Sequence, residues 1–232
     1  MPVFRLSKPM VFPPPEMAES DGLLAVGGDL SSERLLRAYR MGIFPWYGDD
    51  SPILWWSPDP RMVFFPAQWK PSRSLERLVK KGAFDVSMDT AFAAVIEACA
   101  NARGPGRDST WITPEMMAAY IRLHKEGYAH SVECCIDGQL VGGLYGVSIG
   151  GCFFGESMFS NVSNASKVAL AVLMKYLAAR GFTLVDCQVK NDHLVRLGAQ
   201  EIPRTEFLAR LGEALEMETR RGKWEPDTRV QT

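Results

Sequence analysis

The chain has 232 residues, of which 47% are hydrophobic and 23% charged, a composition typical of a folded globular protein. A formal net charge of −1 excludes a strongly basic chain, so any nucleic-acid site is expected to be a local patch. The five cysteines include no CxxC pair. They predict neither a disulfide framework nor a zinc site, and they fit a reducing cytoplasm. The residues indicate no signal peptide, no membrane span, no cofactor and no metal.

The first 60 residues are punctuated by proline and glycine. Ser31 is placed to cap a helix over residues 32–41, and Gly42 follows as a natural stop. The run Ser57-Pro58-Asp59-Pro60 then predicts a linker. We therefore expect a small N-terminal domain over residues 1–60 and a larger domain over residues 61–232.

The rest of the chain alternates helical and extended patterns. A hairpin is expected around Asp137-Gly138, which is a common two-residue turn. Ser163 is a candidate cap for a helix that Gly181 ends. The helices are expected over 72–81, 89–102, 114–126, 164–180 and 192–197, and the strands over 129–136, 139–148, 151–158 and 183–189. This order predicts an α/β (α+β) fold, a mixed sheet flanked by helices as in an acyltransferase-like sandwich.

Three polar residues on two predicted strands are candidates for chemistry. Side chains alternate along a strand, so Asp186 and Gln188 should share one face and Val185 should lie on the other. Glu156 and Met158 share a face of their own strand by the same parity. If the two strands are neighbours, Glu156, Asp186 and Gln188 surround one cavity. The alternative is that these polar groups are buried and hydrogen-bonded to backbone.

A basic stripe lies on the helix expected over 72–81. At helical pitch Arg73, Arg77, Lys80 and Lys81 fall within roughly a 100° arc, with Leu75, Leu78 and Val79 opposite. Lys70 precedes this helix, and only Glu76 dilutes the positive charge. The stripe is either a solvated helix face or a track for phosphates.

Two tryptophans, Trp46 and Trp111, fall in segments that read as loops. An exposed indole can stack on a nucleic-acid base, whereas most tryptophans are buried in a core.

Leu170, Leu173 and Leu177 form a helical stripe whose ordinary role is core packing. His193, near a helix start, is either a base or a local packing residue.

An ordered series of motifs from about Asp21 to Arg204 resembles the bacterial leucyl/phenylalanyl-tRNA–protein transferases. Each motif is weak alone, but their order is specific. They are Gly22–Leu30, Gly42–Trp46, Trp55–Arg61, Gly104–Thr113, His130–Glu133, Leu140–Val147, Gly155–Ser160, Asn164–Lys167, Asp186–Val189, Asn191–Leu194 and Leu197–Ala199. Two positions depart from the pattern, Arg196 where a small residue is expected and Glu76 where a basic one is common.

The resemblance implies a small N-terminal domain followed by a domain of the N-acetyltransferase-like (GNAT-like) fold. It implies transfer of Leu or Phe, with Met as a third candidate donor, from aminoacyl-tRNA to proteins that begin with Arg or Lys, which marks them for degradation by the N-end rule pathway. By the same resemblance Trp46 and Trp111 contact the terminal adenosine. Glu156, Asp186 and Gln188 form the reaction centre, and Arg73, Arg77, Lys80 and Lys81 face the RNA. We expect a cytoplasmic monomer that does not bind membranes.

The chemistry expected at this centre is direct transfer, since no Cys–His or Ser–His arrangement is indicated. Asp186 is the candidate proton acceptor, with transfer through the ribose hydroxyl as its rival. Gln188 would orient the carbonyl or amine, and Glu156 would orient the amine or pair with the acceptor's basic side chain. Replacing Asp186 by Asn is expected to slow transfer and leave thermal stability unchanged. An apolar pocket for the donor side chain is assigned to Leu144, Met158, Leu173 and Val185.

Three other functions remain as alternatives. A coenzyme A-dependent acetyltransferase would need a glycine-rich pyrophosphate loop, and the turn from Phe159 to Lys167 contains no glycine. A tRNA-dependent enzyme that builds peptidoglycan cross-bridges would share the donor but matches the N-terminal motifs less well. A non-catalytic module would bind RNA or protein N-termini without transferring an amino acid.

Overall fold

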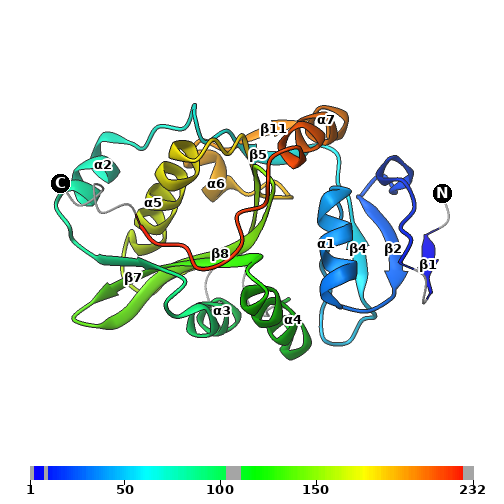
Figure 1. Ribbon diagram of the computed structural model, residues 1–232, viewed down its shortest axis with the longest axis horizontal. Helices are drawn as coiled ribbons and strands as arrows, with labels where there is room; N and C mark the ends of the chain where they lie inside the picture. Colours follow the sequence, from blue (N-terminus) through cyan, green and yellow to red (C-terminus); the bar gives the residue numbers. More distant parts are fainter. Residues whose placement is uncertain (1–2, 8–9, 103–110, 227–232) are drawn as a thin grey trace.

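The computed structural model describes residues 3–7, 10–102 and 111–226, and two sheets carry their architecture (Figure 1). The smaller sheet has the order β1-β2-β4-β3, and the larger has the order β11-β5-β10-β9-β8-β7-β6. The strands are β1 (Phe4–Leu6), β2 (Leu23–Gly27), β3 (Phe44–Pro45), β4 (Leu54–Trp56), β5 (Arg61–Phe64), β6 (Asp85–Met88), β7 (Ala129–Ile136), β8 (Gln139–Ile149), β9 (Cys152–Ser160), β10 (Leu184–Asp186) and β11 (Gln200–Ile202). The chain passes from one sheet to the other between β4 and β5, at the predicted linker.

Helices form where the sequence supplies caps. Ser31, Ser72 and Thr113 each accept a hydrogen bond from a backbone N–H in the first turn of the helix that follows. The helices are η1 (Pro15–Met17), α1 (Ser32–Arg40), α2 (Arg73–Lys80), α3 (Phe92–Asn101), α4 (Pro114–Lys125), α5 (Ala165–Ala179), α6 (Asp192–Arg196) and α7 (Arg204–Leu215). No helix in the described ranges is long and apolar enough to cross a membrane.

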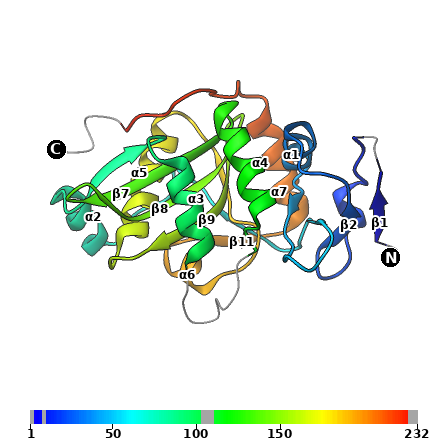
Figure 2. The ribbon, with the colours of Figure 1, turned by 90° about the horizontal axis from the view of Figure 1, so that it is seen from below.

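Helices cover both faces of the larger sheet. α3 and α4 pack against β7 and β8 on one face, and α5 packs against β7, β8 and β9 on the other (Figures 1 and 2). α2 lies on α5, to which it presents Leu75, Leu78 and Val79. α1, from the N-terminal part of the chain, contacts α4, α7 and β8, so the smaller sheet is held against the larger one through this helix.

Most predicted elements are present, with several differences. The hairpin turns at Asp137 and Gly138, whose φ angles of 51° and 74° are those of a type I′ turn. The helix expected from residue 89 begins instead at Phe92, because Asp89 has a left-handed φ of 55°. Ser163 is not the cap of α5: that position belongs to Asn164. No strand was expected at β1–β6 or β11, and no helix at η1 or α7.

After α7, residues 216–226 run back across one end of the larger sheet (Figure 2). Trp224 is 3% exposed and stacks between His130 and Tyr176, with ring centroids 3.7 Å and 4.8 Å away. Its backbone N–H donates to Asp89, which also bonds His130. A segment with no recognisable motif therefore closes part of the core.

Replacing Gly142 with alanine tests the close approach of α5 to the sheet. A Cβ at this position of β8 would collide with the Cβ of Ala165, at the start of α5. We expect Gly142→Ala to lower the free energy of unfolding by about 1–3 kcal/mol, the usual cost of overpacking a core. Gly212→Ala is the matched control. It lies in α7 with nothing within 4 Å of the added Cβ, so it should stabilise the protein by about 1 kcal/mol. Urea denaturation measures both, and equal effects would contradict the packing argument.

Candidate functional site

The main cavity opens where two neighbouring strands part. β9 and β10 pair in parallel from Leu184 opposite Cys152 to Asp186 opposite Phe154, which confirms that these strands are neighbours. β10 ends there, whereas β9 continues to Ser160. The residues of β9 beyond the last pair and the chain after β10 line a cavity of about 900 Å³. We refer to it as the reaction cavity.

The predicted alternation of side chains fails just after β10. The expected strand over 183–189 spans only Leu184–Asp186, and Gln188 adopts a left-handed φ of 59°. The turn is closed by a hydrogen bond from Val189 N to Cys187 O at 2.8 Å. As a result Val185, Cys187 and Gln188 line the reaction cavity and Asp186 does not. The prediction that Asp186 and Gln188 share one face is therefore wrong, because the strand ends before parity reaches Gln188.

Asp186 forms a fully buried ion pair with Arg61. Arg61 Nε lies 2.8 Å from Asp186 Oδ1 and Nη2 lies 2.7 Å from Oδ2, and both side chains have no exposed surface. The guanidinium group also lies over the rings of Phe44 and Phe207, at 4.9 Å and 4.5 Å from their centroids. This bidentate geometry joins β10 to β5. It commits the Asp186 carboxylate to Arg61 and keeps it out of the cavity lining, which places it poorly for accepting a proton there.

Gln188 is held by its backbone and leaves its amide free. Its N–H donates to Asp186 Oδ1 at 2.9 Å, and its carbonyl accepts from Met62 N at 3.3 Å. A left-handed backbone conformation costs free energy at a glutamine, and these two hydrogen bonds offset that cost. The side-chain Nε2 is buried and has no hydrogen-bond partner among the described residues. The site therefore contains one fixed amide whose N–H groups are available to a ligand.

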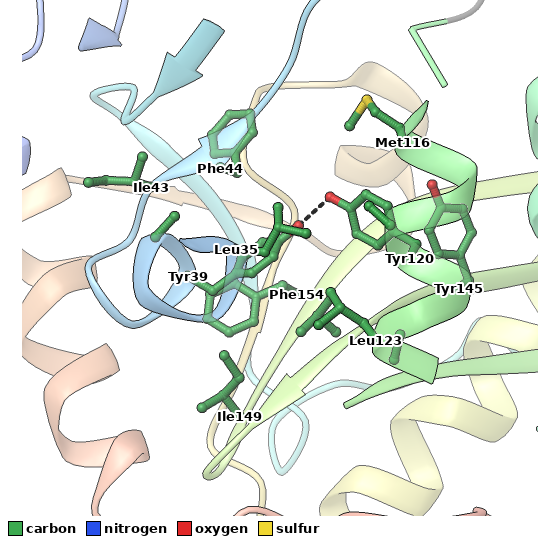
Figure 3. Packing of buried hydrophobic residues seen from close by; sticks show 14 of the residues in the cluster. Leu35, Tyr39, Ile43, Phe44, Met116, Tyr120, Leu123, Tyr145, Ile149 and Phe154 are labelled. Carbon is green, nitrogen blue, oxygen red and sulfur yellow. Dashed lines mark hydrogen bonds between the residues drawn. The ribbon is translucent and has the colours of Figure 1, made fainter. Parts of the chain in front are cut away.

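Glu156 is placed by an irregularity in the sheet. The register of β8 and β9 shifts between the pairs Tyr145–Ser157 and Gly146–Gly155, so Glu156 is the extra residue of a β-bulge. Its carboxyl oxygens accept hydrogen bonds from Tyr39 at 2.7 Å and from Tyr120 at 3.0 Å. The two tyrosines come from α1 and α4, and their hydroxyls lie 2.5 Å apart (Figure 3). Glu156 is the one acidic side chain among the described residues that line the cavity.

Burial raises the pKa of Glu156 to about 7, although the hydrogen bonds from Tyr39 and Tyr120 oppose this. The geometry also favours a proton on this group. Three oxygen–oxygen contacts join the Glu156 carboxyl and the two tyrosine hydroxyls in a ring. Each contact needs one proton to be a hydrogen bond, and the two hydroxyls supply only two protons. A protonated Glu156 supplies the third proton and completes the ring. Glu156 thus changes charge near neutral pH.

The residues assigned to donor binding surround the same cavity. Trp46 and Trp111 both line it, and Trp46 keeps 41% of its surface exposed. The apolar residues Leu144, Met158, Leu173 and Val185 line it as well. Val185 reaches the cavity although strand parity placed it opposite Asp186, because Asp186 is the residue that points away. The arrangement offers an apolar wall beside exposed indole surface.

The basic residues of α2 lie outside the reaction cavity. Arg73, Arg77, Lys80 and Lys81 are all exposed, on the side of α2 opposite its packed leucine and valine side chains. Glu76 pairs with Lys80 at 3.0 Å, which reduces the charge of the stripe as its sequence position indicates. The stripe has the exposure that an RNA contact requires.

Sequence reasoning missed three residues that build the site. Arg61 ends a recognised motif, but a lone arginine beside prolines carries no sign of its buried partner 125 residues away. Tyr39 and Tyr120 fall at buried positions of amphipathic helices and read as core. The available signal was the lone Glu156 on an apolar strand, since a buried carboxyl needs donors.

Two family models match the chain. The leucyl/phenylalanyl-tRNA protein transferase model matches residues 63–212, and the model of that family's N-terminal domain matches residues 28–59. This chain belongs to the leucyl/phenylalanyl-tRNA–protein transferase family. It is a transferase, and both the reaction cavity and the two helices that supply Tyr39 and Tyr120 draw on the matched residues.

Relatives of the same family match this chain over almost its whole length. Proteins named leucyl/phenylalanyl-tRNA–protein transferase from Anaeromyxobacter sp. strain Fw109-5 and Desulforapulum autotrophicum are 56% and 54% identical. The matches cover 98% and 97% of this chain and 97% and 98% of the relatives. Among solved structures, a functionally unknown protein from Staphylococcus epidermidis reaches a TM-score of 0.40 at 10% identity, over 78% of this chain and 68% of that one. That likeness is too low to carry an argument.

Asp186→Asn should destabilise this transferase strongly, contrary to the expectation from sequence. Asparagine keeps the size of the side chain but leaves the buried Arg61 charge uncompensated, which costs about 3–5 kcal/mol. Glu201→Gln is the control, because it breaks an ion pair of similar length, Lys190–Glu201 at 2.7 Å, on the surface. That change should cost less than about 1 kcal/mol. Chemical denaturation compares the two variants. A loss of unfolding free energy below about 1 kcal/mol for Asp186→Asn would contradict the claim that Asp186 compensates the buried charge of Arg61.

Glu156→Gln should change how stability depends on pH. The folded-state pKa of Glu156 lies above its ordinary value of 4.5, so the folded state binds the extra proton and loses stability as pH rises from 4.5 to 7. Glutamine accepts from Tyr39 and donates to Tyr120 without titrating. From about pH 5 to pH 8 the free energy of unfolding of Glu156→Gln should rise relative to that of the wild type by about 2–3 kcal/mol. This value follows from the size of the pKa shift at about 1.36 kcal/mol per pKa unit. Urea titrations at both pH values measure it, and a difference independent of pH would contradict the assignment.

Proposed function

We propose that this enzyme transfers Leu or Phe, and also Met, from aminoacyl-tRNA to the α-amino group of proteins that begin with Arg or Lys. The products would enter N-end rule degradation in the cytoplasm. The observation that carries the proposal is the reaction cavity itself, where one unpartnered amide, one titrating carboxyl, an apolar wall and two indoles meet. Family membership supplies the reaction class, and the GNAT-like fold and the two-domain division at residue 60 belong to the same proposal.

The donor fits the apolar and aromatic part of the cavity. Trp46 and Trp111 present ring faces on which the terminal adenine can stack, an interaction worth about 1–3 kcal/mol per base. Leu144, Met158, Leu173 and Val185 would receive the amino-acid side chain. Met158 is unbranched and flexible, so the pocket can adapt to a branched or an aromatic side chain. No charged residue is assigned to this wall.

The acceptor fits the acidic part. Glu156 would bind the positive charge of the acceptor's N-terminal residue, which favours Arg or Lys over neutral and acidic residues. A bound cation also stabilises the ionised carboxylate, so acceptor binding lowers the pKa of Glu156 from about 7 and releases its proton. The donor and the acceptor are thus recognised by opposite features of one cavity.

The reaction needs little covalent help, because the ester bond of the donor is already activated. The neutral amine forms a bond to the ester carbonyl carbon, the bond to the ribose oxygen breaks, and that oxygen takes the proton that the amine gives up. Gln188 Nε2 would donate to the carbonyl oxygen as negative charge develops on it. Cys187 also lines the cavity, but burial and the charge of Asp186 raise its pKa far above neutral, so it stays a thiol. Direct transfer therefore remains the favoured route.

Transfer of radiolabelled leucine from tRNA to a peptide that begins with Arg tests the function. Peptides that begin with Met or Asp are the controls for acceptor choice, and a cell-wall precursor is the control for the cross-bridge alternative. We expect label in the Arg peptide only. Transfer to the precursor, or tRNA binding without any transfer, would favour the respective alternative.

Gln188→Glu should slow the chemical step and leave donor binding intact. The substitution keeps the shape of the side chain but replaces the free Nε2 donor with an acceptor oxygen. Loss of one donor to a developing oxyanion costs about 10²–10³ in rate. Single-turnover rates at saturating charged tRNA measure the effect without interference from product release. Gln139→Glu, on the exposed start of β8, is the matched control and should be silent. An unchanged rate for Gln188→Glu would remove Gln188 from the reaction.

A further inference from the structure

A second cavity, of about 430 Å³, lies next to the reaction cavity. It is formed where α2 and α5 begin and where α6 ends, and we call it the α2–α5 cavity. Its polar lining includes Lys70, Ser72, Asn164, Lys167, His193 and Arg196. Trp69 fixes one wall, because its indole N–H donates to Leu197 O at 2.8 Å and its ring packs on Gly198.

This cavity gathers positive charge that the protein does not neutralise. Three cationic side chains line it, and no acidic side chain does so among the described residues. Lys70 and Arg196 are exposed and make no hydrogen bond or ion pair with any described residue. Lys167 donates to a neutral amide, Asn164 Oδ1, at 3.1 Å. By contrast Lys80 and Lys190 each pair with a glutamate. Uncompensated cations around a hollow favour an anion.

The backbone adds to this field. α2 and α5 both start at the cavity, and the N-terminus of a helix carries partial positive charge with free N–H groups. The first turn of α5 contains no acidic residue, and Asn164 makes no side-chain cap bond to it. Glu76 in the first turn of α2 is engaged by Lys80. The positive end of α5 is therefore not offset by a nearby carboxylate of its own.

The position of the α2–α5 cavity links two features already described. His193 on α6 lines both this cavity and the reaction cavity, so α6 is the wall between them. On its other side the cavity borders α2, which bears the exposed stripe Arg73, Arg77, Lys80 and Lys81. Partial burial, and then the charges of Lys167 and Arg196, lower the pKa of His193, so the field of these cations reaches the shared wall.

We propose that the α2–α5 cavity binds a phosphodiester group of the single-stranded 3′ end of the donor tRNA, through Lys70, Lys167 and Arg196. The inference rests on the proposed function, which places the terminal adenosine in the reaction cavity. The strand that leads to that adenosine must cross the protein surface, and the α2–α5 cavity lies between the basic stripe and the reaction cavity. Arg196, a departure from the family pattern, thus gains a role as a phosphate ligand.

Three leucyl donors of increasing length test the site. Leucyl-adenosine carries no phosphodiester, the leucylated trinucleotide CCA carries those of the 3′ end, and leucyl-tRNA carries all of them. For Lys167→Gln/Arg196→Gln we expect the Michaelis constants of the trinucleotide and the tRNA to rise at least about tenfold and that of leucyl-adenosine to stay unchanged. The slope of log affinity against log salt should fall by about 0.7 for each single-strand phosphate that the variant no longer neutralises. Arg37→Gln/Lys125→Gln, which removes two exposed cations that line neither cavity, should change none of these values.

The outcomes separate this inference from the proposed function. An equal rise for leucyl-adenosine would show that the cavity does not read phosphate, and a loss confined to leucyl-tRNA would place the contact outside the 3′ end. Either result overturns the proposal. If the wild-type protein transferred leucine from none of the donors, the proposed function would fail. Fluorescence anisotropy with uncharged CCA would still decide the site, since wild type should bind it and the double variant should not. Arg196→Gln alone serves if the double variant does not fold.

Discussion

The buried ion pair between Arg61 and Asp186 is the constraint on which the site depends. It joins the first strand after the linker to the strand that borders the reaction cavity. Because Asp186 also accepts from Gln188 N, the same carboxylate fixes the turn that presents the Gln188 side chain. Removing charges from water is expensive, so a buried ion pair is weak evidence for stability, and the effect that the structure shows here is on geometry. Asp186 is thus a positioning residue in this scheme, and its effect on the reaction would pass through Gln188.

A second constraint ties the N-terminal part of the chain to the same cavity. Tyr39 belongs to α1, beside the smaller sheet, whereas Tyr120 and Glu156 belong to the part that carries the larger sheet. The hydroxyl contact between Tyr39 and Tyr120 lies among the apolar residues through which α1 packs on α4 (Figure 3). Any shift of α1 would therefore break a contact of Glu156, the carboxyl of the cavity. This is a physical reason for the N-terminal segment to accompany the larger one, since it completes the environment that sets the charge of Glu156.

The sequence predicted the elements whose signals are local, such as the capped helices and the hairpin at Asp137-Gly138. It could not predict where β10 stops, because that depends on pairing with β5 and β9, so the parity argument for Asp186 and Gln188 failed. The bulge at Glu156 could not be predicted for the same reason, since it is a register shift in the pairing of β9 with β8. Arg61 lies 125 positions from Asp186, and no periodicity connects such partners. A motif lists residues without saying which side chains they contact, which is why the motif series could not show that Asp186 pairs with Arg61 and does not line the cavity.

The distribution of charge explains how a chain with a net charge of −1 can handle a polyanionic substrate. Four exposed cations lie on the outer side of α2 and three more line the α2–α5 cavity, whereas the one carboxyl among the described lining residues lies at the reaction cavity. In the proposed function, a tRNA would be drawn to the first two regions by charge. The partly buried carboxyl of Glu156 would repel it little while protonated, and would ionise when a cationic acceptor binds. The raised pKa of Glu156 would then reconcile two substrates of opposite charge, because under the proposed function the carboxyl becomes fully negative only when the cationic acceptor that neutralises it is bound.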